Sequence, residues 1–229
     1  MKANVTCIVP AGGSGTRIGK KTNKLFLEIN EIPLIAYTLL ALEKSEFISE
    51  IIIASKEEDI LYMSDIVSAF EIKKVKTIVK GGATRGESVL SASKEVSCNC
   101  DYVMVHDGAR PFVTDDIIRE TVNDAMKFFA AACGVKPKCT LKLIDDEKII
   151  AGTVDREKTV EIQTPQVFSK ELFDKMYALD VDTIKKATDD CVLAEKVGAK
   201  IVVTEGSYKN IKVTTPEDLK IAEAFIRGL

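Results

Sequence analysis

The stretch VTCIVPAGGSGTRIGKKTNKLF, residues 5–26, decides the fold of this chain. Its first six residues form an apolar run that ends at Pro10, and glycines follow directly. An apolar run of this length, closed by proline and glycine, is typical of a strand buried in a parallel sheet. Ligands of open α/β sheets bind at the carboxyl ends of such strands. The stretch therefore predicts an α/β fold whose first loop borders a ligand site.

The rhythm of apolar strands and amphipathic helices continues along the chain. Further strands are predicted over residues 50–55, 75–79, 101–106, 131–136 and 201–205. Helices are predicted over residues 33–44, 57–70 and 187–197, from the GGATRGES segment to about 97, after Thr114 and after Thr215. This alternation favours a mostly parallel, doubly wound, Rossmann-like sheet with helices on both faces.

One segment interrupts the alternation. Extended runs near 140–144 and 148–154 flank Asp145-Asp146-Glu147, a pattern that predicts a β-hairpin. A hairpin at this point has no place in a doubly wound core. We therefore expect residues 1–229 to form a single domain from which an arm of about 138–157 protrudes, and such extensions often pack on a second subunit.

The composition excludes several classes of function. The 229 residues are 46% hydrophobic and carry a net charge of −3, so the basic field that holds nucleic acid is absent. No apolar run approaches the ~18–20 residues of a membrane span, and the N-terminus leads into the first strand without a signal peptide. The six cysteines are scattered, and the pair Cys98 and Cys100 lacks the partners of a metal site. We expect a cytoplasmic protein with reduced thiols and no nucleic-acid or membrane partner.

The glycine-rich loop has the chemistry of a phosphate site. Glycines let backbone N–H groups approach an anion closely. Four cationic side chains follow within eight residues, as a polyphosphate requires: Arg17, Lys20, Lys21 and Lys24. The loop matches neither the P-loop motif, because Thr16-Arg17 follow Gly15, nor the dinucleotide fingerprint, because Ile18 stands at its third glycine. The alternative is a glycine-rich turn with solvated lysines.

A second polar group closes the strand at 101–106. In VMVHDGARPF, residues 103–112, the apolar strand runs into His106 and Asp107, with Arg110 close behind. A carboxylate at a strand end beside a phosphate loop can hold a divalent cation or a ribose hydroxyl. The alternative is a capped turn with an Asp107–Arg110 pair. His106 is the only histidine, and a lone histidine is more often structural than catalytic.

Two further segments complete the set. GGATRGES, residues 81–88, offers Gly82 for close approach and Ser88 for a hydrogen bond to a base or a helix cap, and its Arg85 suits a structural role. YKNIKVTTPEDL, residues 208–219, places Lys212 in an extended run before a capped helix.

In this order, the segments resemble the 2-C-methyl-D-erythritol 4-phosphate cytidylyltransferase family. The matching stretches span residues 10–219 and are PAGGSGTRIG with NKLF, GGATRGES, VHDGARPF, AGTVDR, QTPQVF, ATDD and NIKVTTPEDL. The resemblance implies a nucleotidyltransferase fold and a homodimer whose arms reach the partner's site. It implies Mg²⁺-dependent transfer of a cytidylyl group from CTP to methylerythritol phosphate, a polyol phosphate, with release of pyrophosphate. A ribitol 5-phosphate cytidylyltransferase, with the same CTP site, is the alternative, which TVDR and ATDD disfavour.

The resemblance also implies roles for the residues of the CTP site. Backbone groups of the loop would bind the triphosphate: Ala11, Gly12, Gly13 and Gly15. Three cations would stabilise the α-phosphate in the transition state: Arg17, Lys24 and Lys212. Gly82 and Ser88 would read cytosine. Asp107 would meet the ribose or substrate hydroxyls, with Arg110 nearby, and Mg²⁺ would be held mainly by the CTP phosphates, with Asp107 as a candidate ligand.

The hairpin arm carries the implied substrate residues. Thr140 and Arg156 would hold the methylerythritol phosphate in the neighbouring subunit's site. The chain departs from the family pattern in KPKCTLK, residues 136–142, where Cys139 replaces the usual Asp. We still expect activity, because Arg156 is present. A nucleotide-binding module without turnover would be expected to lack the cations at 17, 24 and 212, and all three are present.

Overall fold

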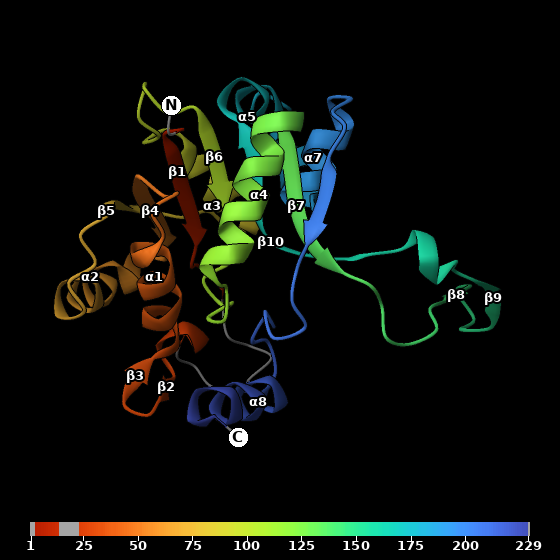
Figure 1. Cartoon of the computed structure of the whole chain (residues 1–229), viewed down its shortest axis with the longest axis horizontal. Helices are drawn as coiled ribbons and strands as arrows, with labels where there is room; N and C mark the ends of the chain where they lie inside the picture. Colours follow the sequence, from red (N-terminus) through yellow and green to blue (C-terminus); the bar gives the residue numbers. More distant parts are fainter. Residues whose placement is uncertain (1–2, 14–22, 229) are drawn as a thin grey trace.

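A seven-stranded sheet forms the centre of the computed structural model, which describes residues 3–13 and 23–228 (Figure 1). The strand order is β11-β7-β10-β6-β1-β4-β5. The strands are β1 (Val5–Pro10), β4 (Glu50–Ser55), β5 (Val75–Lys80), β6 (Tyr102–Val105), β7 (Ala130–Val135), β10 (Glu161–Ser169) and β11 (Val202–Glu205). Neighbours pair in parallel except at β10, which runs antiparallel to both β6 and β7. The predicted mostly parallel sheet is confirmed.

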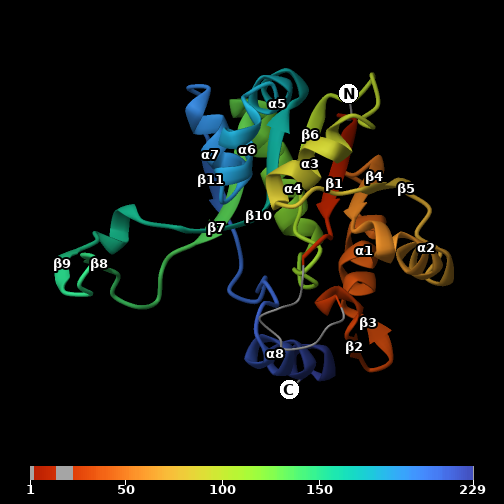
Figure 2. The ribbon, with the colours of Figure 1, turned by 180° about the vertical axis from the view of Figure 1, so that it is seen from behind.

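Helices cover both faces of the sheet, as Figures 1 and 2 show from opposite sides. One layer holds α1 (Leu34–Lys44), α2 (Ile60–Ala69) and α4 (Asp115–Phe128); the other holds α3 (Arg85–Ser93), α5 (Lys170–Tyr177), α6 (Val181–Lys186) and α7 (Asp190–Lys196). The last helix, α8 (Pro216–Arg227), lies beside the short ladder of β2 (Glu28–Ile29) and β3 (Ile32–Pro33). The described residues also contain the short 3-10 turns η2 (Lys24–Phe26), η3 (Glu57–Asp59) and η4 (Arg156–Lys158). Within the described ranges, no helix is long and apolar enough to cross a bilayer.

Capping residues fix the helix starts that border the sheet edge. The Thr84 hydroxyl accepts a hydrogen bond from the Glu87 N–H, and the Glu87 carboxylate accepts one from the Thr84 N–H. This reciprocal box satisfies two N–H groups that a helix start leaves unpaired. Thr215 forms the same box with Asp218 ahead of α8, and Thr114 caps α4 as predicted. The loop before α3 is therefore held at a defined place.

Strand β10 is the one strand of the central seven-stranded sheet that the sequence did not predict; the short β2 and β3 were not predicted either. It lies between β6 and β7, yet three of its buried residues are polar: Gln163, Thr164 and Gln166. A polar run around Pro165 lacks the apolar signal of a buried strand. Partners from distant segments satisfy these side chains, as described below, and periodicity does not reveal such partners. The helices α5 and α6 were not predicted either.

The predicted hairpin is confirmed as a separate two-stranded sheet. It consists of β8 (Lys142–Ile144) and β9 (Ile150–Thr153), which pair antiparallel with each other. Figures 1 and 2 show it projecting away from the rest of the molecule, on two long connections from β7 and to β10.

Candidate active site

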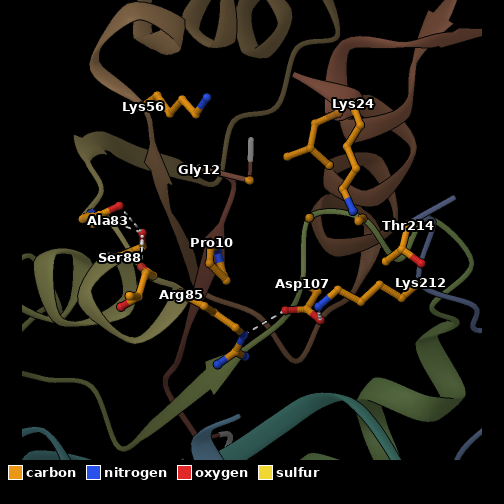
Figure 3. A pocket seen from close by; sticks show the side chains of 16 residues that line it. Pro10, Gly12, Lys24, Lys56, Ala83, Arg85, Ser88, Asp107, Lys212 and Thr214 are labelled. Carbon is orange, nitrogen blue, oxygen red and sulfur yellow. Dashed lines mark hydrogen bonds and ion pairs between the residues drawn. The ribbon is translucent and has the colours of Figure 1, made fainter. Parts of the chain in front are cut away.

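A cavity of about 430 Å³ opens where four neighbouring parallel strands end (Figure 3). Gly12 follows β1, Lys56 follows β4, Gly82 follows β5 and Asp107 follows β6. Lys24 and the segment with Lys212 and Thr214 enter from elsewhere in the chain. The fold thus brings the predicted strand-end segments to one edge of the sheet, as parallel α/β topology requires.

Most of the predicted CTP-site residues lie around this one cavity. The predicted residues that line it are Gly12, Gly13, Lys24, Gly82, Ser88, Asp107 and Lys212. Ala11 is buried just before the glycines, and its N–H donates to the Ala54 carbonyl at 2.7 Å. Gly15 and Arg17 lie outside the described residues.

Residues 81–88 form one wall of the cavity, and hydrogen bonds within this segment hold its shape. The Ser88 hydroxyl donates to the Thr84 carbonyl at 2.9 Å and accepts from the Gly82 N–H at 3.2 Å. A Cβ at Gly82 would lie 2.3 Å from the Glu87 Cβ, closer than real Cβ atoms approach other atoms. The turn therefore requires glycine at this position. In this turn, the backbone of residues 82–83 faces the cavity. The Ser88 oxygen keeps one lone pair to which no described residue donates a hydrogen bond.

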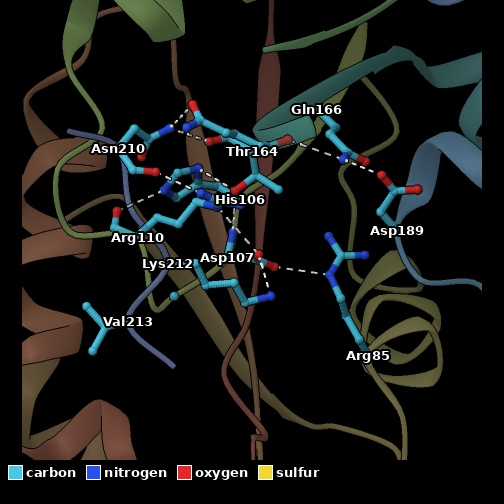
Figure 4. A network of polar contacts seen from close by, with 12 residues as sticks. Arg85, His106, Asp107, Arg110, Thr164, Gln166, Asp189, Asn210, Lys212 and Val213 are labelled. Atoms are coloured by element: carbon cyan, nitrogen blue, oxygen red, sulfur yellow. Dashed lines mark hydrogen bonds and ion pairs between the residues drawn. The ribbon is translucent and has the colours of Figure 1, made fainter. Parts of the chain in front are cut away.

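Three cations surround the carboxylate of Asp107 (Figure 4). Its Oδ1 lies 3.1 Å from Arg85 Nε, and its Oδ2 lies 2.8 Å from Lys212 Nζ and 3.7 Å from Arg110 Nε. Burial would raise the pKa of Asp107, but the positive charges of Arg85 and Lys212 outweigh that effect and hold the pKa well below its usual range. The carboxylate is therefore ionised, and the Asp107–Arg110 pair is one part of a larger cluster.

His106 supports this cluster from behind. The Thr164 oxygen accepts from the Asp107 N–H at 3.0 Å, so its hydroxyl is free to donate to His106 Nδ1, 3.1 Å away. The other ring nitrogen, Nε2, then carries the proton and donates to the Arg110 carbonyl at 3.2 Å. Burial lowers the pKa of His106 to about 4. A neutral, buried imidazole with both nitrogens occupied agrees with a structural role.

Polar contacts attach the Lys212 segment to the rest of the site. Arg110 Nη1 donates to the Asn210 carbonyl at 2.7 Å, and the Asn210 amide donates to the Thr164 carbonyl at 2.9 Å. Lys24 Nζ donates to the Val213 carbonyl at 2.7 Å. Arg110 thus lies behind the cavity rather than in its lining, and Lys24 approaches the extended segment that carries Lys212.

Thr140 and Arg156 lie on the exposed arm and outside the lining of this cavity. Arg156 Nη1 is 3.5 Å from the Lys138 carbonyl, a contact within the arm itself. Conversely, Lys56 and Thr214 line the cavity without having been predicted; the signal that marks Lys56 is its position directly after a buried strand.

The described residues offer little to a metal ion by themselves. Within residues 3–13 and 23–228, no group of three or more His, Cys, Asp or Glu side chains is placed to hold one. Asp107 is the single carboxylate in the described lining, and it already faces three cations. A divalent cation here would need most of its ligands from a bound molecule.

Glycine backbone, converging lysines and one ionised carboxylate at a parallel sheet edge define the class of protein. They suit a nucleotidyltransferase, which binds a nucleoside triphosphate and neutralises the charge of its phosphates.

Comparisons with known proteins specify the family. Residues 5–228 match the family model for IspD, 2-C-methyl-D-erythritol 4-phosphate cytidylyltransferase. An enzyme of this name from Bacillus cereus is 44% identical over 222 residues, 97% of each chain. Another, from Caldanaerobacter subterraneus subsp. tengcongensis, is 42% identical over 98% of this chain and 99% of its own. The crystal structure of 4-diphosphocytidyl-2C-methyl-D-erythritol synthase from Anaerococcus prevotii superposes with a TM-score of 0.86 at 31% identity, covering 99% of this chain and 100% of that one.

The chain belongs to the 2-C-methyl-D-erythritol 4-phosphate cytidylyltransferase family. The family and the enzyme class that the sequence motifs predicted are thereby confirmed.

The buried His106 predicts a specific dependence of stability on pH. Its pKa falls from 6.5 to about 4 on folding, so between these values the unfolded chain binds a proton that the folded chain does not. The contribution of neutral His106 to the free energy of unfolding is fully present above pH 6.5. It is lost as the pH falls towards 4, and the total loss is about 3 kcal/mol.

Urea unfolding of the wild type and of His106→Gln at pH 7.5 and pH 5 measures this effect, because the chain has no other histidine. The stability advantage of the wild type should shrink by about 2 kcal/mol at the lower pH. An advantage that stays constant would show that His106 is protonated in the folded protein.

Proposed function

We propose that the protein transfers the cytidylyl group of CTP to 2-C-methyl-D-erythritol 4-phosphate in this cavity and releases pyrophosphate. The observation that carries the proposal is the convergence of Lys24 and Lys212 on a cavity walled by Gly12 and Gly13. Reduced thiols are usual in the cytoplasm, and all six cysteines are free, so we place the reaction there.

The chemistry requires positioning and charge neutralisation rather than a general base. The attacking group is the phosphate of the alcohol substrate, which is already ionised at neutral pH. It attacks the α-phosphorus of CTP in line, an O–P bond forms, and the bond to the pyrophosphate leaving group breaks. Lys24, Lys212 and, from the family resemblance, Arg17 stabilise the charge that develops on the α-phosphate. This division of roles leaves His106 outside the chemistry, as its buried hydrogen bonds require.

The hydrogen bonds of Ser88 favour cytosine over uracil. Its hydroxyl proton is committed to a backbone carbonyl, so the oxygen can only accept a further hydrogen bond. Cytosine carries an amino donor at C4, whereas uracil carries a carbonyl acceptor there. If the C4 edge of the base faces Ser88, a bound UTP would place its C4 carbonyl oxygen against the Ser88 oxygen, and neither could donate a hydrogen bond to the other. The backbone at Gly82 would contribute to the same recognition.

Mg²⁺ fits the site as a companion of the nucleotide. CTP supplies phosphate oxygens as ligands, and Asp107 is the protein carboxylate that could complete the set. The metal would supply further charge neutralisation on the triphosphate. The surrounding lysines bind the phosphate oxygens that remain.

We also propose that residues 1–229 form one nucleotidyltransferase domain that dimerises through the arm at about 138–157. Four large apolar side chains of the hairpin are 59–62% exposed: Leu143, Ile144, Ile149 and Ile150. Exposed apolar side chains in a projecting hairpin favour burial against a second subunit. Docking of the arm would deliver Thr140 and Arg156 to the partner's cavity, where Arg156 suits a phosphate.

The proposed function is tested by pyrophosphate release from purified protein with Mg²⁺. CTP, UTP, ATP and GTP are each paired with 2-C-methyl-D-erythritol 4-phosphate, and CTP is also paired with ribitol 5-phosphate. Turnover with CTP and the methylerythritol substrate alone supports the proposal. Faster turnover with ribitol 5-phosphate would transfer the assignment to the alternative substrate.

Lys24→Ala should lower kcat by about a hundred- to a thousand-fold, with a smaller change in KM for CTP, because the cation meets charge that grows in the transition state. Steady-state pyrophosphate release gives both constants. Lys56→Ala is the matched control, since it removes a positive charge from the same cavity at a residue that, in the described part of the chain, has no hydrogen bond to the Lys212 segment. Equal losses of kcat in the two variants would contradict a special role for Lys24.

Arg156→Ala should raise KM for the alcohol phosphate far more than KM for CTP. When it is mixed with Lys24→Ala and subunits exchange, each mixed dimer should hold one site with both residues intact. At an alcohol phosphate concentration far below the raised KM, where both parent variants are nearly inactive, an equal mixture should then recover about a quarter of the wild-type activity, since half of the dimers are mixed. Absence of recovery, with exchange verified by labelled subunits, would rule out a shared site.

A further inference from the structure

Arg85 joins two buried carboxylates from different parts of the chain. Its Nε lies 3.1 Å from Asp107 Oδ1, and its Nη1 lies 2.7 Å from Asp190 Oδ2. Figures 3 and 4 show the side chain reaching across to Asp107. Asp190 is fully buried and lies outside the cavity lining, so it cannot act by touching a bound ligand. The other Asp190 oxygen accepts a hydrogen bond from the Tyr177 hydroxyl.

Because of where Arg85 lies, its contact with Asp107 sets the distance between two walls of the cavity. Arg85 is the first residue of α3 and directly follows the wall at 81–84, whereas Asp107 belongs to the wall after β6. Asp190 is the first residue of α7, on the same face of the sheet as α3. The guanidinium group thus fixes the separation between the wall assigned to the nucleobase and the carboxylate assigned to the sugar.

Asp190 also determines how Arg85 shares Asp107 with Lys212. Arginine prefers to bind both oxygens of one carboxylate. Asp190 holds Nη1 and thereby the rotation of the guanidinium group, in which Nε faces Asp107 Oδ1 and Oδ2 remains for Lys212 Nζ at 2.8 Å. Without that restraint, the guanidinium group is free to turn until Nε and Nη2 bind both oxygens of Asp107, in competition with Lys212.

We propose that Asp190 and Tyr177 are positioning residues of the CTP site, which act through Arg85 on Asp107 and Lys212. The inference rests on the proposed function, because it takes CTP as the molecule that the cavity binds. Asp190, although buried and outside the cavity lining, would thus have a role in binding CTP.

Asp190→Asn tests the proposal against the matched variant Asp189→Asn. Both remove one negative charge at neighbouring positions, so a general electrostatic gain in CTP binding is common to them. Asp189 caps α7 and accepts from Gln166, without an ion pair to Arg85. Asparagine keeps the helix cap through its Oδ1 and loses only the acceptor for the Gln166 amide. Calorimetric titration with CTP and Mg²⁺ should show a Kd about ten- to a hundred-fold higher for Asp190→Asn than for Asp189→Asn.

Tyr177→Phe keeps the ring contact with Phe173 and removes only the hydroxyl that orients Asp190. Its Kd for CTP should rise about three-fold, and this measurement decides the question if Asp190→Asn does not fold. Equal CTP affinity of folded Asp190→Asn and Asp189→Asn, or an unchanged Tyr177→Phe where the former cannot be purified, overturns the proposal. Wild-type protein that binds CTP but releases no pyrophosphate overturns the proposed function instead and leaves the binding comparison valid.

Discussion

The ionised carboxylate of Asp107 is the group around which the cavity is organised. An unpaired carboxylate out of water costs several kcal/mol, so a buried one must be surrounded by cations and hydrogen-bond donors. Arg85, Arg110 and Lys212 meet it from three segments that are far apart in the sequence. The requirement to neutralise one buried charge therefore fixes the start of α3, the turn after β6 and the extended segment before α8 relative to one another.

The same requirement makes the cavity ready for an anion. The cations that face Asp107 exceed its charge, and Lys24 adds another positive group beside the Lys212 segment. A triphosphate enters a site whose cations are already held in place, so little reorganisation is needed when charge moves during the reaction. The described lining residues include no side-chain nucleophile paired with a general base. Preorganisation of the cations explains how such a site can still accelerate phosphoryl transfer.

Much of this arrangement could be predicted from the sequence because its signals are local. The buried strands, the glycine turns and the threonine caps each depend on a few adjacent residues, and parallel topology then gathers the strand ends. The antiparallel strand β10 could not be predicted in this way, since its polar side chains are satisfied by distant partners, such as His106 for Thr164 and Asn210 for Gln163. The sequence likewise indicates only a structural role for Arg85, because its partner Asp190 lies about a hundred positions away.

The arm has a further consequence that follows from where it leaves the sheet. It connects β7 to β10, which are adjacent antiparallel strands, so the arm is an enlarged loop of a hairpin whose base is locked in the central sheet. Loops of this kind change in length and sequence at little cost to the core. If the arm binds the alcohol phosphate, as proposed, the part of the protein that selects the alcohol can diverge separately from the part that binds the nucleotide. Exchange of the arm between relatives offers a natural route to new polyol acceptors on an unchanged cytidylyl donor site.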